Sequence, residues 1–147
     1  MYGGVYVSTD NGNHFIQRNS GLSDLKINSF TAEGNSVYVL TEDSSVFRTT
    51  NNGLNWTSAS NGLQGMKLLC VSSNGVNIFA GSKSNGIFMS TNSGINWSNI
   101  NNGLAQLKIQ GITVSNNTLI LICRNSTNSD IDKIVRSTNN GQAGKSP

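Results

Sequence analysis

Short apolar runs separated by polar turns extend along the whole chain. Two of these runs, residues 37–40 and 77–80, place mostly apolar side chains on both faces of an extended backbone. Pairs of Gly and Asn lie between such runs, at Gly34 and Asn35, Asn74 and Gly75, and Asn85 and Gly86. Runs of this length between such turn residues predict β-strands. Because both faces are apolar, we expect sheets that pack between two neighbours.

An eight-residue motif recurs with a nearly fixed period, and we call each copy a box. Boxes begin at Ser8, Thr49, Ser90 and Ser137, which gives spacings of 41, 41 and 47 residues. A Gly-Leu pair follows 13 residues after the start of each of the first three boxes, at Gly21, Gly62 and Gly103. Two markers thus share one register. A period of about 40–50 residues with several short strands per unit predicts a β-propeller.

Each repeat unit predicts one four-stranded antiparallel blade, with strands A to D running from the hub outward. The units cover about residues 1–22, 23–63, 64–104 and 105–147 of a single domain. In the second unit we expect the strands at residues 27–32, 36–41, 45–50 and 55–60. The first unit supplies only strands C and D, and the last supplies A, B and C. The all-β chain therefore holds about three blades.

Three blades do not close a ring, because propellers usually have about four to eight. Two alternatives remain. Either the chain is a piece of a longer propeller, or strands C and D of one chain complete strands A and B of a partner. The second arrangement gives a six-bladed ring in a two-fold homodimer and leaves the final strand C redundant. We favour it because symmetric dimers are the commonest oligomers.

The residues of the box suit a turn. Its third position can accept hydrogen bonds from turn amides, its glycine can adopt the positive φ of a tight turn, and its aromatic residue can cover the turn. The third positions are Asp10, Asn51, Asn92 and Asn139. The glycines are Gly12, Gly53, Gly94 and Gly141, and the aromatics are Phe15, Trp56 and Trp97. We interpret Asp10 as a turn former rather than a catalytic acid, and His14 as a surface residue.

The box resembles the Asp-box, or BNR repeat, S-x-D-x-G-x-x-W. That repeat occurs in sialidases, in propellers of the photosystem-assembly type and in secreted bacterial repeat proteins. The resemblance implies a propeller outside a bacterial cell, with the boxes on C–D turns facing away from the functional face. It specifies a fold more closely than an activity.

Composition and charge exclude several classes of protein. The 147 residues contain 10 Lys and Arg against 7 Asp and Glu, and the basic residues are scattered singly, which is unlike a nucleic-acid binder. Two cysteines, Cys70 and Cys123, and one histidine provide neither a disulfide framework nor a metal site, and we expect no cofactor. No apolar run reaches the about 18 residues of a membrane span. The chain opens without a signal peptide, so an extracellular location suggests an excised segment.

The candidate site lies on the face opposite the boxes, where the D–A and B–C connections meet. Lys26, Lys67 and Lys108 occupy equivalent positions at the start of strand A. Since strand A is innermost, these lysines can ring the channel mouth and attract carboxylate, sulfate or phosphate groups. Alternatively they are ordinary solvated residues. The equivalent small residues Ser29, Cys70 and Gly111 suit a narrow hub, and the polar insertion 124–130 is either a ligand loop or a tolerated insertion.

Catalysis is the weaker hypothesis. A sialidase-like site requires an arginine triad, a Tyr–Glu pair and an acid/base Asp, and the few arginines and glutamates here cannot be assembled into one. The arginines are Arg18, Arg48, Arg124 and Arg136, and the glutamates are Glu33 and Glu42. We therefore expect a non-catalytic binding or scaffold module for glycans or protein partners. The alternatives are a sialidase-like glycoside hydrolase with an atypical site and a structural segment of a larger adhesin-like protein.

Overall fold

The computed structural model describes residues 3–102, 104, 107–125 and 132–141. Within them the chain is all β, as predicted. The strands are β1 (Tyr6–Val7), β2 (Ile16–Gln17), β3 (Ile27–Glu33), β4 (Ser36–Thr41), β5 (Val46–Thr49), β6 (Thr57–Ser58), β7 (Leu68–Ser73), β8 (Ile78–Ser82), β9 (Ile87–Ser90), β10 (Ser98–Asn99), β11 (Leu107–Ser115), β12 (Thr118–Asn125) and β13 (Asp132–Ser137).

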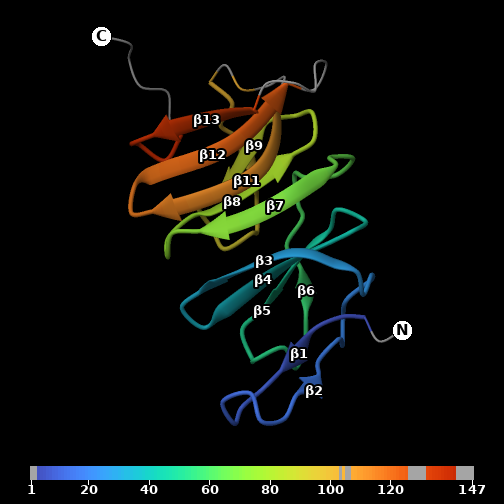
Figure 1. Ribbon diagram of the computed structural model, residues 1–147. Coiled ribbons are helices and arrows are strands. Elements are labelled where there is room, and N and C mark those ends of the chain that lie inside the picture. The colour runs from blue at the N-terminus through green and yellow to red at the C-terminus, as the bar shows by residue number, and fades with distance from the viewer. Residues whose placement is uncertain (1–2, 103, 105–106, 126–131, 142–147) are drawn as a thin grey trace.

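The strands form four antiparallel sheets that follow one another along the chain (Figure 1). Blade 1 is β1–β2, blade 2 is β3–β6, blade 3 is β7–β10, and blade 4 is β11–β13. Within each sheet, neighbours along the chain are neighbours in space. The first strands of blades 2, 3 and 4 lie side by side, with β7 between β3 and β11. This arrangement confirms the predicted fold of four-stranded antiparallel blades, with the strand order A to D within a blade.

The innermost strand of each blade is interrupted at the same place. The register of strand A against strand B shifts between Ile27 and Ser29 in blade 2, and the same shift recurs in blades 3 and 4. There it falls between Leu68 and Cys70 and between Ile109 and Gly111. A bulge of one residue bends a strand and increases its twist. The three inner strands therefore bend alike, which keeps their starting ends in one register.

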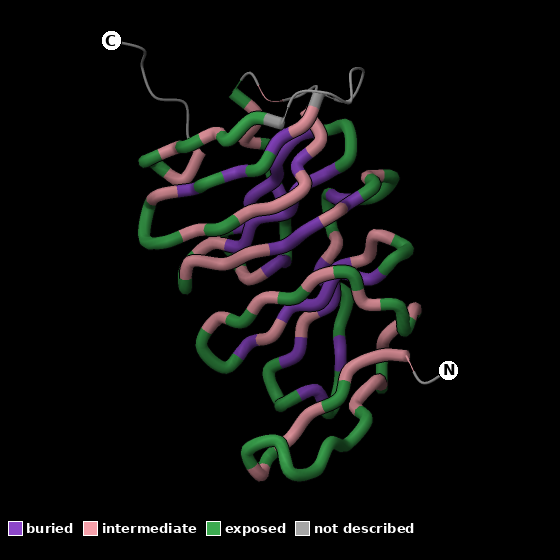
Figure 2. The backbone as a smooth tube through the Cα atoms, viewed as in Figure 1, coloured by how far each residue is buried: buried purple, intermediate pink, exposed green. Residues whose placement is uncertain are grey.

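The core consists of the layers between blades (Figure 2). Tyr38 of blade 2 and Phe79 of blade 3 occupy equivalent positions on strand B and are both fully buried. Trp56 anchors the layer between blades 1 and 2, and Trp97 that between blades 2 and 3. Cys70, Ile109 and Cys123 belong to the layer between blades 3 and 4. Strand B is apolar on both faces because each face meets a different neighbour.

The part of the chain that the structure describes contains no helix long and apolar enough to cross a membrane. Nor does it gather three His, Cys, Asp or Glu side chains that could hold a metal ion.

Candidate functional site

The boxes form the C–D turns, and their hydrogen bonds repeat from copy to copy. In the first box the Ser8 hydroxyl accepts the Gly12 amide at 2.8 Å and donates to Asp10 Oδ1 at 2.8 Å. Asp10 Oδ1 also accepts the His14 amide at 2.9 Å. Asn51 and Asn92 accept the amides of Asn55 and Asn96 in the same way, at 3.0 and 2.8 Å. An amide oxygen thus replaces the carboxylate oxygen without changing the turn.

The box requires two consecutive residues in the left-handed region. In the second box, Asn52 has φ of 56° and Gly53 has φ of 78°. The same pair of positive φ values recurs at Asn11 and Gly12, Ser93 and Gly94, and Asn140 and Gly141. The fourth position of the box is therefore as constrained as the glycine, although the sequence pattern drew attention only to the glycine. Asn tolerates this conformation better than most residues.

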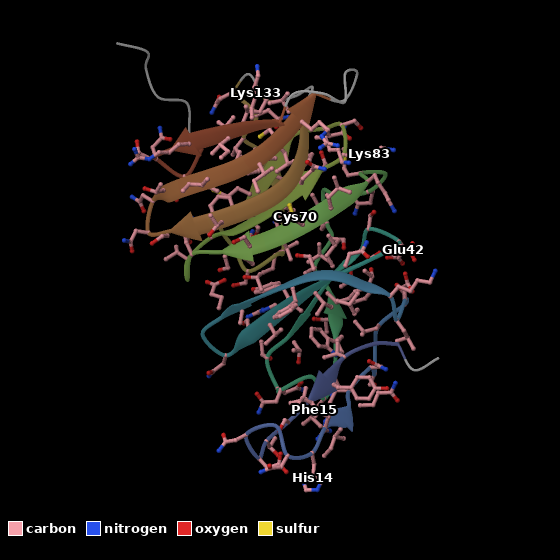
Figure 3. The ribbon with its side chains drawn as sticks, in the orientation of Figure 1. His14, Phe15, Glu42, Cys70, Lys83 and Lys133 are labelled. Carbon is pink, nitrogen blue, oxygen red and sulfur yellow. The ribbon has the colours of Figure 1, made fainter. Side chains whose placement is uncertain are left out.

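The box tryptophans bond the preceding blade, a contact that the sequence did not predict. The Trp56 indole Nε1 donates to the carbonyl of Arg18 in blade 1 at 2.8 Å, and the Trp97 indole donates to that of Ala59 in blade 2 at 2.7 Å. Each tryptophan therefore joins its own blade to the preceding blade by a hydrogen bond. Phe15 lies in the first described blade and is 63% exposed (Figure 3), because no described blade precedes it.

The His14 imidazole is hydrogen-bonded to Asp10 on the exposed surface of the first box, with Nδ1 and Oδ2 2.6 Å apart. The His14 amide and imidazole hold the pKa of Asp10 below its usual value, and the Ser8 hydroxyl adds to this effect. The other boxes carry Asn55 and Asn96 at the position of His14. The pair therefore orders one turn and is not a repeated chemical feature of the propeller.

The three predicted lysines lie at one end of the inner strands, on the side opposite the boxes. Lys26 forms an exposed ion pair with Glu42, with Nζ and Oε2 2.8 Å apart. Glu42 also raises the pKa of Lys26, chiefly through this hydrogen bond. The Lys67 ammonium instead donates to the backbone carbonyl of Glu42 at 2.8 Å. Lys108 lies on β11, where it is half-buried.

Each lysine faces a second charged residue at the end of strand B, and the sign of that residue changes along the chain. The Glu42 amide donates to the Lys26 carbonyl at 2.8 Å, and the Lys83 amide donates to the Lys67 carbonyl at 2.7 Å. In blade 4, Lys108 and Arg124 are direct cross-strand partners. The position opposite the lysine therefore holds Glu in blade 2, Lys in blade 3 and Arg in blade 4.

We call Lys67, Lys83, Lys108 and Arg124 the basic edge. Figure 3 shows Lys83 and Glu42 on the same side of the stack, at the ends of neighbouring blades. The sequence has no Asp or Glu between Asp43 and Asp130, so blade 3 contributes no carboxylate to balance these cations. Sequence reasoning missed Glu42, Lys83 and Arg124 as a set, although they also share the 41-residue register.

A hollow of about 370 Å³ opens beside Lys67, between blades 2 and 3. Asp43 lines it, together with the segments 44–45, 60 and 63–66. The Thr41 hydroxyl holds the pKa of Asp43 below its usual value, so this carboxylate stays ionised. Asp43 repels anions from this hollow, so an anion would meet fewer carboxylates further along the basic edge, at Lys83 of blade 3.

The small residues of the hub are structural. Cys70 is buried, and its sulfur lies 3.6 Å from the carbonyl of Ile109 on the neighbouring inner strand. Burial raises the pKa of the Cys70 thiol to about 12, which suppresses the nucleophilic thiolate. Cys123 is also a buried free thiol. Of the polar insertion, residues 126–131 lie outside the described part of the chain.

Of the four arginines that could not be assembled into a sialidase-like triad, Arg48 is bound within its own blade. Its guanidinium donates to the Ser36 hydroxyl at 2.9 Å and lies 5.9 Å from the centre of the Tyr38 ring. These contacts lie within blade 2 and away from the basic edge. Arg48 therefore stabilises its own sheet.

Sheets of up to four strands, each running outward from an inner strand and stacked on the next, define a β-propeller. The chain belongs to the DUF6242 beta propeller domain family, whose model matches residues 3–145. No curated protein sequence matches it.

Solved structures with the same fold are larger proteins. The GH74 enzyme of Niastella koreensis has a TM-score of 0.69 and 16% identity, and the match covers 96% of this chain and 26% of that one. The GH74 xyloglucanase of Xanthomonas campestris has a TM-score of 0.63 and 14% identity, over 96% and 27%. YCF48 bound to D1 peptide has a TM-score of 0.59 and 18% identity, over 77% and 39%. The chain thus spans about a quarter of the GH74 enzymes, and these likenesses concern the fold.

Proposed function

We propose that the chain is a non-catalytic binding module whose basic edge binds an acidic peptide segment. The observation that carries this proposal is the change of sign opposite the three lysines. Lys26 is neutralised by Glu42, whereas Lys67 faces Lys83 with no carboxylate in blade 3. In blade 4, Arg124 lies between Lys108 on β11 and Asp132 on β13, so the excess of positive charge is greatest at blade 3. Like charges opposite each other destabilise a strand pair. An anionic ligand between the cations offsets this repulsion.

The charge distribution also supports a binding role over a hydrolytic one. Glycoside hydrolysis generally needs two carboxylates that flank the bond to be broken. Glu42 is paired with Lys26, and Asp43 is hydrogen-bonded to the Thr41 hydroxyl and the Ser45 amide. The sequence offers no further carboxylate before Asp130. A sialidase-like activity is therefore not our proposal.

The ligand class follows from what the basic edge presents. Its recognition groups are ammonium and guanidinium ions, which pair with carboxylates. The exposed aromatic residues of the described chain, Tyr6, Phe15 and Phe30, lie in blades 1 and 2 and not along this edge. A neutral sugar chain would use such rings as a stacking surface. Among the structural neighbours, YCF48 was solved bound to a peptide, and this supports a peptide ligand for the fold.

The wider proposal keeps two expectations from the sequence. We propose that the box is a divergent Asp-box and that the module acts outside a bacterial cell. Both rest on the sequence resemblance of the boxes.

The test is a titration of the chain with a fluorescent Glu-rich peptide. We expect saturable binding that weakens with added salt, because exposed charge pairs are screened. Replacing Lys67→Ala and Lys108→Ala together should weaken binding by about tenfold. Lys26→Ala is the matched control, since Lys26 shares the register but is already neutralised by Glu42.

Two results would overturn the proposal. One is unchanged peptide affinity in the Lys67→Ala, Lys108→Ala variant. The other is binding of a neutral xyloglucan oligosaccharide in preference to the peptide. Tighter binding of polygalacturonate than of the peptide would mean that the basic edge is a binding site, but for an acidic polysaccharide and not for a peptide.

A further inference from the structure

A polar hollow of about 100 Å³ lies between blades 2 and 3, on the side of the boxes. Arg48 of β5 and residues 57–59, which include β6, form its wall in blade 2. The box turn at residues 93–95 forms its wall in blade 3. A hollow of this size has room for a group larger than one water molecule. Its described lining includes a guanidinium and several hydroxyl-bearing residues but no carboxylate.

Three polar residues form a row across blade 2 that leads to this hollow. Tyr38 of β4 is the direct cross-strand partner of Arg48, and Arg48 is that of Thr57 on β6. Directly opposed residues of antiparallel strands place their side chains on the same face of a sheet. Tyr38 packs in one cluster with Trp97 of blade 3, so this face is turned toward blade 3. The row therefore runs from the buried layer between the blades out to the hollow.

The Arg48 guanidinium has unused donors. A guanidinium carries five N–H donors and a permanent positive charge. In Arg48, Nε and Nη2 both donate to the Ser36 hydroxyl, at 3.2 and 2.9 Å. No ion pair joins Arg48 to a carboxylate among the side chains that the structure describes. Three N–H groups therefore remain for a ligand, and the half-buried charge has no counter-ion within the described chain.

The Tyr38 hydroxyl is a second unused polar group beside the hollow. It is buried and has no hydrogen-bond partner. The Tyr38 ring lies against the box turn of blade 3, since a Cβ built on Gly94 would be 3.5 Å from Tyr38 Cε1. Gly94 lines the hollow, and Cε1 is bonded to the ring carbon that carries the hydroxyl. The unsatisfied hydroxyl therefore lies close to the wall of the hollow, where a bound oxygen atom would give it an acceptor.

Packing between blades does not require these two polar residues. Blade 3 carries Phe79 at the position of Tyr38 and Met89 at that of Arg48, and both are buried. The equivalent layer is thus packed by two apolar side chains. Blade 2 departs from the repeat at both positions together, and each departure introduces a polar group beside the hollow. This joint departure points to a ligand.

We propose that the hollow between blades 2 and 3 binds one small oxyanion group, a carboxylate, sulfate or phosphate. The Arg48 guanidinium supplies the positive charge and the adjacent N–H donors that pair with such groups. Hydroxyl donors come from the lining residues, among them Ser58 and Ser93. The site lies on the side of the boxes, opposite the basic edge. This inference is therefore independent of the proposed peptide ligand.

The first experiment is an NMR titration of the isotope-labelled chain with sodium sulfate, at an ionic strength held constant with sodium chloride. We expect saturable shifts of the Arg48 Nε–H signal and of the Gly94 amide. Arg48→Met copies the residue of blade 3 and should weaken sulfate binding, read from the Gly94 amide, by about tenfold or more. Arg18→Met is the matched control, because it removes the same charge from a residue outside the described lining of the hollow.

The outcomes separate this site from general salt effects and from the basic edge. Shifts that do not saturate, or an equal Gly94 shift in the Arg48→Met chain, would overturn the inference. Loss of the Gly94 shift in the Lys67→Ala, Lys108→Ala variant would also overturn it, because the sulfate would then bind at the basic edge. Sodium acetate and sodium phosphate, titrated in the same way, show whether the site prefers a planar or a tetrahedral oxyanion, and saturation by either supports it.

The second experiment compares thermal unfolding with and without sulfate. The double variant with Tyr38→Phe and Arg48→Met reproduces the side chains of blade 3 and should therefore fold. Sulfate stabilises proteins in general because it is excluded from their surface, and this effect is common to both chains. A ligand that binds only the folded state raises Tm further. We expect a larger rise in Tm for the parent chain than for the double variant, and equal rises would contradict the proposed site.

Discussion

At the scale of single residues, Tyr38 combines full burial with an unsatisfied polar group. Its hydroxyl is the one buried side-chain N or O atom without a hydrogen-bond partner in the described part of the chain. The Arg48 guanidinium lies 5.9 Å from the ring centre and does not bond the hydroxyl. Blade 3 carries Phe79 at the equivalent position, also fully buried. The aromatic ring, which Tyr38 and Phe79 share, therefore fills the layer between blades, and the Tyr38 hydroxyl is not needed for this packing.

Tyr38→Phe should therefore leave the free energy of unfolding unchanged or raise it by about 1 kcal/mol, because it removes an unpaired buried hydroxyl. Chemical denaturation of the two proteins measures the difference. A loss of stability larger than the error of extrapolation would indicate that the hydroxyl has a bonding partner in solution.

The buried thiols provide a second test at this scale. Because burial raises the pKa of Cys70 from 9.0 to about 12, the folded chain holds a neutral thiol at pH 8. Maleimide or Ellman's reagent should react with Cys70 only after unfolding. The sign for stability follows: above about pH 9 the unfolded chain ionises this thiol and the folded chain does not, so the fold loses stability toward pH 12. Rapid labelling of the native protein at pH 8 would contradict the assigned burial.

At the scale of elements, the box joins blades as well as turning the chain. The turn positions the tryptophan, and the tryptophan then bonds the preceding blade through its indole. Backbone atoms take part as well, since the Trp56 amide donates to the Ser20 carbonyl in blade 1 at 2.8 Å. Gly21 lets the two backbones approach, because a Cβ there would collide with the Trp56 carbonyl. The Gly-Leu pair of one blade and the box tryptophan of the next blade thus contact each other.

Trp97 variants measure this contact. Trp97→Phe keeps the ring but loses the hydrogen bond to Ala59, which should cost about 1 kcal/mol of unfolding free energy. Trp97→Ala also empties the layer between blades 2 and 3 and should cost about 3–5 kcal/mol. Equal stability of the two variants would show that Trp97 does not stabilise the fold by packing against the preceding blade.

The sequence predicted the elements of blade 2 closely, with one informative difference. Strand B was expected at 36–41 and is found at Ser36–Thr41, because its apolar run ends in clear turn residues. Strand D was expected at 55–60 but is only Thr57–Ser58. The Trp56 amide bonds blade 1 instead of β5, so the ladder starts later. A repeat pattern reveals positions within one unit, whereas a bond between units depends on how the units stack.

At the scale of the whole molecule, the repeat pattern identified only part of the candidate site, because it does not show which residues face each other across paired strands. The register identified Lys26, Lys67 and Lys108 because they are identical. It did not identify Glu42, Lys83 and Arg124, because their charges differ and only the pairing of strands A and B places them opposite the lysines. The stack then carries its charge unevenly, with a neutral pair in blade 2 and a like-charged pair in blade 3, whereas Arg124 of blade 4 lies between Lys108 and Asp132.

The peptide affinity of the Lys83→Glu variant tests most directly whether the basic edge is the binding site. This substitution copies the Lys26–Glu42 pair of blade 2 into blade 3, so Lys67 gains an ion-pair partner instead of a like charge. We predict about tenfold weaker binding of the Glu-rich peptide, together with a slightly higher Tm because the repulsion is removed. Unchanged or tighter peptide binding by the folded variant would contradict the assignment of the basic edge as the binding site.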